Sequence, residues 1–287
     1  MNNSKVVGID IGGSHITAAI VDLENRAVLP GTLVRNRVDS HAPAATIITE
    51  WSKTIRQVSE LTAGVSKKIG LAMPGPFDYE QGICLIQGLD KYEKLYKLNV
   101  KQLLAQELDI EEAAVLMMND ASCFLQGEIF GGAVIGCNNV IGVTLGTGLG
   151  SARFHDGVIY DGDLYYTPFR NGTAEDFISS RWFVRKYAAI TGKYVKDVKE
   201  LCDMVSGDPA IQMLFDEFGK NLGEVLSKYI IKHNCETIVA GGNIINAWEL
   251  FFRETEKVLN RLPKPILIRR ALLGEESALV GAASLWK

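Results

Sequence analysis

Apolar positions along the first half of the chain follow the two-residue period of strands more often than the helical period. They predict strands near residues 5–11, 15–21, 26–37 and 66–73, and one helix near 43–63, where Pro43 can take an early helical position. The apolar run 113–118 then leads into Asn119 and Asp120, and a helix is expected through Ile129, before the Gly131-Gly132 pair ends it.

The second half of the chain is mainly helical in its pattern. Helices are predicted near 175–191, 195–205, 209–232, 246–261 and 275–286, and buried strands at 237–240 and 265–269. No Ser/Pro-rich linker or low-complexity segment separates the two halves. We therefore expect two lobes that are closely joined.

One strand-turn-strand pattern occurs twice, 134 positions apart: residues 6–20 align without a gap on residues 140–154. Each copy predicts a hairpin whose turn consists of glycines and small hydroxyl residues, which leave backbone amides open to a ligand. Converging amides bind oxyanions, and Ser14, Thr144 and Thr147 add hydroxyl groups. Either turn alone is compatible with an ordinary hairpin that binds nothing, but the pair is a candidate for gripping two ends of a triphosphate.

Composition narrows the classes of partner. The chain has 287 residues, enough for two lobes, and a formal net charge of −4 without any Lys/Arg-rich run, so no nucleic acid is expected as a partner. Neither a signal peptide pattern nor a long apolar stretch occurs, which predicts a cytoplasmic protein without a membrane partner. The five cysteines are scattered and form neither a disulfide framework nor a zinc motif: Cys84, Cys123, Cys137, Cys202 and Cys235.

Six short motifs, in this order along nearly the whole chain, resemble the landmarks of the ROK family of sugar kinases and sugar-sensing repressors. They lie at residues 10–14, 73–76, 119–121, 144–150, 240–243 and 274–283. The resemblance implies an α/β protein with the two-lobed ribonuclease H-like/actin-like ATPase fold and a duplicated β-hairpin phosphate-binding frame. It implies an N-terminal lobe of residues 1–112, on which the C-terminal helix 275–287 packs, and a C-terminal lobe of residues 113–274.

Asp120 is the candidate catalytic residue. A carboxylate at the carboxyl end of a buried strand can accept the proton of an attacking hydroxyl, while helix amides keep it ionised; an Asp in this place is also a favoured helix N-cap, and the two roles are compatible. The resemblance implies the base role for Asp120 and a hydrogen bond from Asn119 to a sugar. It also implies ATP and Mg²⁺ as cofactors, with Asp10 facing the metal through water, and a homodimer.

The remaining candidate residues are glycines and small polar residues in turns. Gly75, between Pro74 and Pro76, either faces the sugar or is a plain connector. Gly241 and Gly242 either admit the adenosine of the nucleotide or form a tight strand-to-helix turn. The predicted nucleotide-binding set is Asp10, Gly12, Gly13, Ser14, Thr144, Gly146, Thr147, Gly148, Gly241, Gly242 and Asn243.

Residues 160–176 depart from the family pattern, because they lack its Glu-x-Gly-His sugar clamp and its zinc-binding cysteines. No zinc is expected, since this segment cannot supply a tetrahedral ligand set. Glu175 lines up with the downstream sugar-binding glutamate of the family, and is otherwise a favourable acid in the first turn of a helix. The residues in place of the clamp either stack on a substituted sugar or pack against the helix that follows: Tyr165, Tyr166, Pro168, Phe169 and Arg170.

The resulting expectation is an ATP-dependent kinase for a hexose or hexose derivative, similar to a glucokinase or an N-acyl-hexosamine kinase. One alternative is a non-catalytic sugar-binding regulator on the same frame, but the first strand begins near Lys5, so we expect no DNA-binding extension before it. The other alternative is an actin- or chaperone-like ATPase, for which the chain is short and the 74–76 and 119–120 motifs have no evident purpose.

Overall fold

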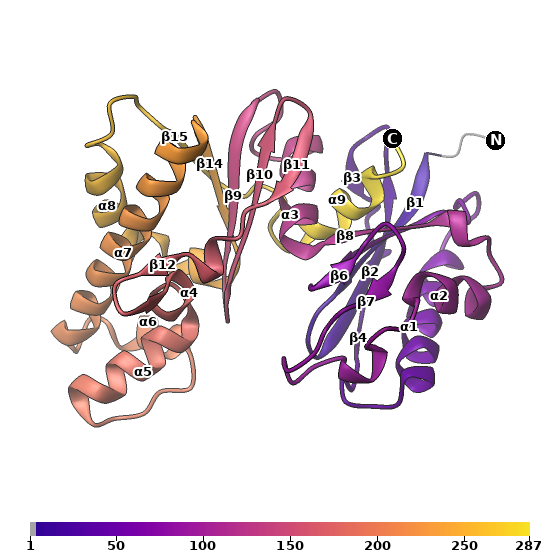
Figure 1. Ribbon diagram of the computed structural model, residues 1–287, viewed down its shortest axis with the longest axis horizontal. Coiled ribbons are helices and arrows are strands. Elements are labelled where there is room, and N and C mark those ends of the chain that lie inside the picture. The colour runs from indigo at the N-terminus through magenta and orange to yellow at the C-terminus, as the bar shows by residue number, and fades with distance from the viewer. Residues whose placement is uncertain (1–3) are drawn as a thin grey trace. The chain divides into compact units, whose positions relative to one another are not determined.

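The computed structural model describes residues 4–287, and these residues form two compact units (Figure 1). The first unit comprises the chain up to Ile135 together with Leu272–Lys287, and the second comprises Gly136–Ala271. The expected boundary lies after residue 112, whereas strand β8 (Val115–Asn119) and helix α3 (Asp120–Phe130) belong to the first unit. The reason is that β8 pairs with a strand of the first unit and α3 packs on the C-terminal helix α9 (Ser277–Ser284).

The sheet of the first unit has the order β3-β2-β1-β5-β8, and β4 also pairs with β2. Strands β1 and β2 form an antiparallel hairpin, whereas β5 and β8 run parallel to β1. Because parallel strands end at the same edge, the carboxyl ends of β1, β5 and β8 meet there. The strands are β1 (Lys5–Ile11), β2 (His15–Asp22), β3 (Ala27–Val28), β4 (Val34–Arg37) and β5 (Ile69–Met73).

The sheet of the second unit repeats this plan, with the order β11-β10-β9-β14-β15. Strands β9 and β10 form the antiparallel hairpin, and β14 and β15 run parallel to β9. The duplication therefore covers the whole sheet and not only the hairpin seen in the sequence. The strands are β9 (Asn139–Leu145), β10 (Leu149–His155), β11 (Val158–Asp161), β14 (Thr237–Gly241) and β15 (Leu267–Arg270).

Helices cover the sheets within each unit. In the first unit these are α1 (Ala44–Ser59), α2 (Val100–Leu108), α3 and α9, with the short pair β6 (Phe77–Asp78) and β7 (Ile83–Cys84) and the 3₁₀ turns η1 (Glu93–Leu95), η2 (Glu112–Ala114) and η5 (Gly274–Glu276). In the second unit they are α4 (Ala174–Phe177), α5 (Ser180–Thr191), α6 (Val198–Met204), α7 (Pro209–His233) and α8 (Trp248–Leu259), with β12 (Pro168–Phe169), β13 (Gly172–Thr173), η3 (Leu164–Tyr166) and η4 (Asn243–Ala247).

Two predicted elements are interrupted for local reasons. The helix expected over 175–191 is two helices, because Ser179 caps a new one by accepting a hydrogen bond from the Trp182 amide. The strand expected over 26–37 is broken between β3 and β4, where the Thr32 hydroxyl donates to Leu29 O and accepts from Ile20 N. None of the helices within residues 4–287 is long and apolar enough to cross a membrane.

The C-terminal helix α9 lies against the rest of the first unit with backbone on backbone. A Cβ added at Gly8 would lie 2.1 Å from Leu279 O, one at Gly70 would lie 2.0 Å from Ala282 O, and one at Gly281 would lie 1.8 Å from Cys123 O. Helix α9 therefore packs directly on β1, β5 and α3 at positions that only glycine can fill. This contact fixes the frame that holds the carboxyl ends of the strands.

Glu128, on α3, is fully buried and accepts four hydrogen bonds. The donors are Ala133 N (2.7 Å), Leu272 N (3.0 Å), Leu273 N (2.9 Å) and Ser277 Oγ (2.7 Å). Among residues 4–287 no basic side chain pairs with it. One carboxylate thus fixes both points at which the chain leaves and re-enters the first unit.

The packing of α9 gives a stability prediction. Replacing Gly281→Ala should lower the free energy of unfolding by about 3 kcal/mol or more, because the added methyl group cannot avoid the Cys123 carbonyl without moving a helix. Urea unfolding followed by circular dichroism measures this change.

The matched control is Gly207→Ala, where the nearest heavy atom to the new Cβ is Met204 O at 3.8 Å. That substitution should change the free energy of unfolding by less than about 1 kcal/mol. Equal effects of the two substitutions would contradict the close packing of α9.

Candidate functional site

Asp10 and Asp120 lie at the common carboxyl edge of β1, β5 and β8. In the sheet, Asp10 is beside Ala72 and Asn119 is beside Met73. Asn119 is the N-cap of α3, since its Oδ1 accepts from Ala121 N (2.9 Å) and Ser122 N (3.2 Å). Asp120 is the first residue of the helix, and its Oδ1 also accepts from Ala121 N (2.9 Å). Asn119 therefore carries the cap that the sequence also allowed for Asp120.

Burial makes both carboxylates reluctant to ionise. It is the main cause that raises the pKa of Asp10 to about 6, and the negative charge of Asp120 raises it further, whereas Arg35 acts in the opposite direction. The pKa of Asp120 is also raised by burial, while the Ala121 amide and the positive charge of Lys91 oppose the shift. Two half-buried acids with raised pKa values at one edge of a sheet are a common property of functional sites.

Gly75 lies next to Asn119 in this unit, in a turn with a cis peptide bond to Pro76. A Cβ at Gly75 would be 3.0 Å from the Tyr79 hydroxyl and 3.8 Å from Asn119 Nδ2. Tyr79 donates its hydroxyl hydrogen to Met73 O (2.9 Å) and accepts a hydrogen bond from Asn119 Nδ2 (3.3 Å). The Asn119 amide therefore retains one N–H beyond this contact, and Tyr79, which sequence reasoning missed, sets its orientation.

The two glycine-rich turns follow equivalent strands but differ in length by one residue, since residues 12–15 separate the last paired residues of β1 and β2 and residues 146–148 separate those of β9 and β10. Gly12 N donates to His15 O (2.8 Å) in the first turn, and Gly146 N donates to Gly148 O (3.1 Å) in the second. Gly13 and Ser14 in the first turn are exposed, as is Thr147 in the second. Each turn thus presents small residues to solvent at the end of a buried hairpin.

Gly241 and Gly242 end β14 beside Thr144, which pairs with Gly241 in parallel. Gly242 has φ +88°, and a Cβ there would lie 2.5 Å from Leu145 O. Only glycine fits this position, so the tight strand-to-helix turn is real, and Asn243 begins η4 directly after it. The same closeness brings the backbone of this turn next to the end of β9.

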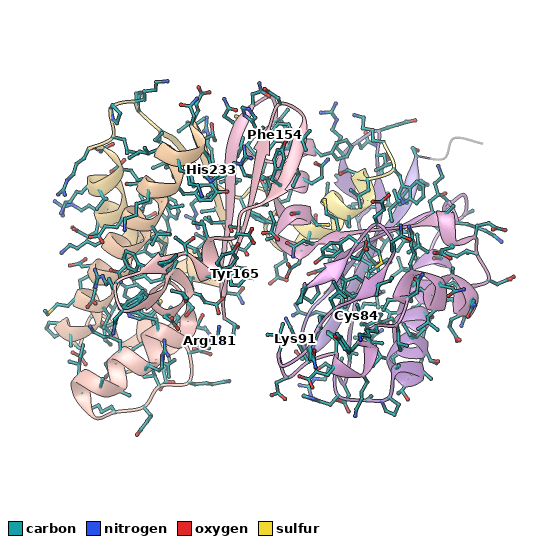
Figure 2. The ribbon with its side chains drawn as sticks, viewed as in Figure 1. Cys84, Lys91, Phe154, Tyr165, Arg181 and His233 are labelled. Atoms are coloured by element: carbon teal, nitrogen blue, oxygen red, sulfur yellow. The ribbon has the colours of Figure 1, made fainter. Side chains whose placement is uncertain are left out.

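Glu175 already has partners within the second unit. Its Oε2 accepts from Leu149 N (2.9 Å), and its Oε1 pairs with Arg181 of α5, which Figure 2 labels. A Cβ at Gly148 would lie 2.4 Å from Glu175 Oε2, so the carboxylate sits directly on the second turn. Glu175 therefore holds the turn in place, and both of its carboxylate oxygens already have partners, Leu149 N and Arg181.

The segment in place of the sugar clamp divides into a buried part and an exposed part. Phe169 is 3% exposed and packs edge-to-face on Phe177, with the Arg170 guanidinium over both rings. Tyr165 and Tyr166 are 48% and 52% exposed and contact each other edge-to-face. Packing against the following helix thus accounts for Phe169 and Arg170, whereas about half of the surface of each tyrosine stays exposed.

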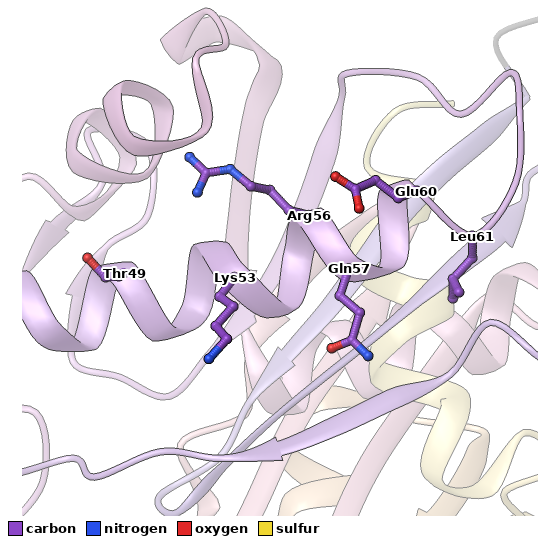
Figure 3. A pocket seen from close by; sticks show the side chains of 6 residues that line it. All are labelled: Thr49, Lys53, Arg56, Gln57, Glu60 and Leu61. Carbon is purple, nitrogen blue, oxygen red and sulfur yellow. The ribbon is translucent and has the colours of Figure 1, made fainter.

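One hollow in the first unit lies away from the candidate residues. A hollow of about 610 Å³ along α1 is lined by Thr49, Lys53, Arg56, Gln57, Glu60 and Leu61 (Figure 3). It contains none of the candidate residues. Within residues 4–287, no cluster of three or more His, Cys, Asp or Glu side chains is arranged to hold a metal ion.

Comparison with known proteins identifies the family. The ROK family model matches residues 6–166 and 169–287, so the chain belongs to the ROK family. The chain is 26% identical to a glucokinase of Thermotoga maritima, over 100% of this chain and 98% of that protein. The fold is accordingly the two-lobed actin-like ATPase fold.

Solved structures agree on this fold. A ROK family glucokinase from Streptomyces griseus, in complex with glucose and AMPPNP, superposes with a TM-score of 0.79 at 23% identity, over 98% of each chain. A ROK family transcriptional regulator, described as a homologue of the E. coli MLC protein, has a TM-score of 0.80 at 18% identity, over 98% of this chain and 77% of that one. The frame is therefore shared by kinases and regulators.

The raised pKa of Asp10 predicts how stability depends on pH. Its pKa is about 6 in the folded chain against an ordinary value of 3.8, so Asp10 favours folding when protonated, and that contribution is lost as the pH rises through about 6. Asp10→Asn is neutral at every pH. The variant should therefore be more stable than the wild type above about pH 6, by up to about 3 kcal/mol, and equal to it near pH 4.

Urea unfolding between about pH 4 and about pH 8, with EDTA present to exclude divalent cations, measures the difference. Asp203→Asn, at an exposed position of the second unit, serves as a control without a change. A variant no more stable than wild type at the highest pH would refute the burial of an unfavourable charge at Asp10.

Proposed function

We propose that the protein is an ATP-dependent kinase that phosphorylates a hydroxyl of a hexose or hexose derivative. The observation that carries the proposal is the placement of Asp10, Asn119 and Asp120 at one carboxyl edge, next to the Gly75 turn and the first glycine-rich turn. Membership of the ROK family and the similarity to a glucokinase support the same reaction class.

Asp120 acts as the general base in this proposal. Its burial raises its pKa towards the range in which a carboxylate takes up a proton at the working pH, and Ala121 and Lys91 keep the ionised form accessible. Phosphoryl transfer needs little covalent work from a protein, so a base, oriented amides and positive charge suffice. Asn119 and the backbone of Gly75 orient the acceptor sugar beside this base.

The exposed amides and hydroxyls of the two turns bind phosphate groups of ATP, and Gly241, Gly242 and Asn243 contact its adenosine part. Asp10 fits Mg²⁺, because its half-buried carboxylate offers oxygen ligands to a hard cation that keeps most of its water. Bound Mg²⁺ would supply positive charge for the phosphates. No structural zinc is part of this proposal, because residues 160–176 lack the cysteines that a tetrahedral zinc site requires.

The acceptor differs from free glucose in this proposal. The clamp that reads adjacent hydroxyls is missing, Glu175 is engaged with Arg181 and Leu149, and Tyr165 and Tyr166 offer exposed aromatic faces. Such a surface favours a substituted sugar, for example an N-acyl hexosamine or a glycoside, because apolar contacts discriminate weakly against added groups.

The engagement of Glu175 also favours a second candidate, a regulator that binds a sugar without phosphorylating it. The two candidates differ in one measurable quantity, which is ADP formation dependent on the sugar. The following experiment separates them.

The test is a panel of glucose and of 1- and 2-substituted hexoses with ATP and Mg²⁺, read by coupled ADP release. At least one sugar should be turned over, and Asp120→Asn should lower kcat by a factor of about 10² or more while leaving nucleotide and sugar affinity nearly unchanged. The substitution keeps the shape of the side chain and removes a charge that burial disfavours, so it should not lower stability at neutral pH.

Sugar binding by calorimetry without ADP release would establish the regulator instead. Near-normal turnover in Asp120→Asn would remove the base role from this residue. A preference for unmodified glucose above about 10³-fold would contradict the proposed acceptor class, since it needs about 4 kcal/mol of polar contacts.

Lys91 gives a prediction for the pH dependence. Its positive charge lowers the pKa of Asp120, so Lys91→Met should raise that pKa. Because the base works only when ionised, the acidic limb of kcat/KM should then move to higher pH. Lys94→Met, at an exposed position of the same segment, should leave the limb in place. An unchanged limb in Lys91→Met would mean that Lys91 does not act on the base.

A further inference from the structure

The first glycine of each turn has its carbonyl oxygen held by a hydroxyl from elsewhere in the same unit. In the first unit, the Tyr92 hydroxyl donates to Gly12 O at 2.5 Å. In the second unit, the Ser180 hydroxyl donates to Gly146 O at 2.9 Å, and Ser180 N donates to the same oxygen at 2.8 Å. Gly12 and Gly146 are equivalent positions of the duplicated frame, so the same peptide group is fixed twice by unrelated residues.

A fixed carbonyl has a direct consequence for the next amide. The peptide group is planar and trans, so the N–H of the following residue points away from the carbonyl oxygen. The amides concerned are those of Gly13 and Thr147, which are exposed and donate to no atom among residues 4–287. Holding the carbonyl on the protein side therefore directs a free N–H donor to the solvent side of each turn.

Tyr92 is itself held in place by ring packing and by a backbone hydrogen bond. It is fully buried, its ring packs edge-to-face on Trp51 with centroids 5.3 Å apart, and its own amide donates to Ser40 O at 2.9 Å. Its backbone is left-handed, with φ +53°. Since a buried hydroxyl requires a partner, this arrangement fixes the donor and with it the Gly12 carbonyl.

We infer that Tyr92 and Ser180 are positioning residues that aim the Gly13 and Thr147 amides at oxyanion oxygens of the ligand. The inference rests on the proposed function for the identity of the ligand as a nucleotide. Neither residue touches the reacting atoms. Their effect is on the affinity of the turns for phosphate groups, because an amide fixed in advance loses no freedom on binding.

The test compares Tyr92→Phe and Ser180→Ala with wild type in calorimetric binding of two probes, Mg²⁺-AMPPNP and tripolyphosphate. Tyr92→Phe keeps the ring and removes only the donor, so it should weaken binding of both probes roughly threefold to tenfold, the range for one neutral hydrogen bond. Ser180→Ala should have the smaller effect, below about threefold, because Ser180 N still holds Gly146 O.

Two control variants remove the same kinds of hydroxyl group from residues that do not hold a turn carbonyl. Tyr96→Phe alters a half-buried tyrosine four residues further along the same segment, and Ser227→Ala removes a hydroxyl that donates to a helix carbonyl, Gly223 O, at 2.7 Å. Neither should change the affinity for either probe. All measurements are made at a temperature where circular dichroism shows each variant folded.

The outcomes separate this inference from the proposed function. If no sugar is phosphorylated but Tyr92→Phe still weakens phosphate binding, the proposed kinase activity is refuted and the positioning role is supported. Binding in Tyr92→Phe as tight as in wild type, or equally weakened in Tyr96→Phe, would overturn the inference. A wild type that binds neither probe would overturn both.

Discussion

The buried carboxylate of Glu128 is the interaction on which the architecture of the first unit depends. It gathers three backbone amides and the Ser277 hydroxyl around one anion, from segments that lie up to 149 positions away in the chain. A buried carboxylate without its donors would be costly, so loss of any one of these contacts should weaken the junction. They join α3 to the start of η5 and α9, and α3 in turn begins with Asp120. The position of the candidate base is therefore tied to the point where the chain re-enters the unit.

The two sheets share one strand order, and the side chains around their glycine-rich turns differ. Asp10 occupies in one copy the place of Thr144 in the other, which puts the charge in only one unit. The turn carbonyls are held by a tyrosine in one copy and a serine in the other. The strand order is thus common to both copies, whereas the chemistry is assigned by individual side chains.

Local pattern predicted much of this structure. The hairpin strands, the long helix near 209–232 and the buried strand near 237–240 all appear within a few residues of their expected bounds, because each has a strong period and clear ends, such as the Asp208 cap of α7. The domain boundary could not be predicted, since it depends on β8 pairing with β5 and on glycine contacts between α3 and α9. Sequence patterns also could not show the roles of four residues: Tyr79, Tyr92, Lys91 and Glu175. Each of these residues acts through a contact or a charge that only the folded chain brings into place.

The return of the chain to the first unit has a consequence for synthesis on the ribosome. The second unit is one continuous stretch, Gly136–Ala271, and can fold as soon as that stretch has emerged. The first unit is translated earlier, yet its strands β1 and β5 lack their covering helix until Ser277–Ser284 is made. The first unit therefore starts to be synthesised first but completes its fold last. Until then its sheet, still without α9, is the incompletely folded species that a chaperone would bind.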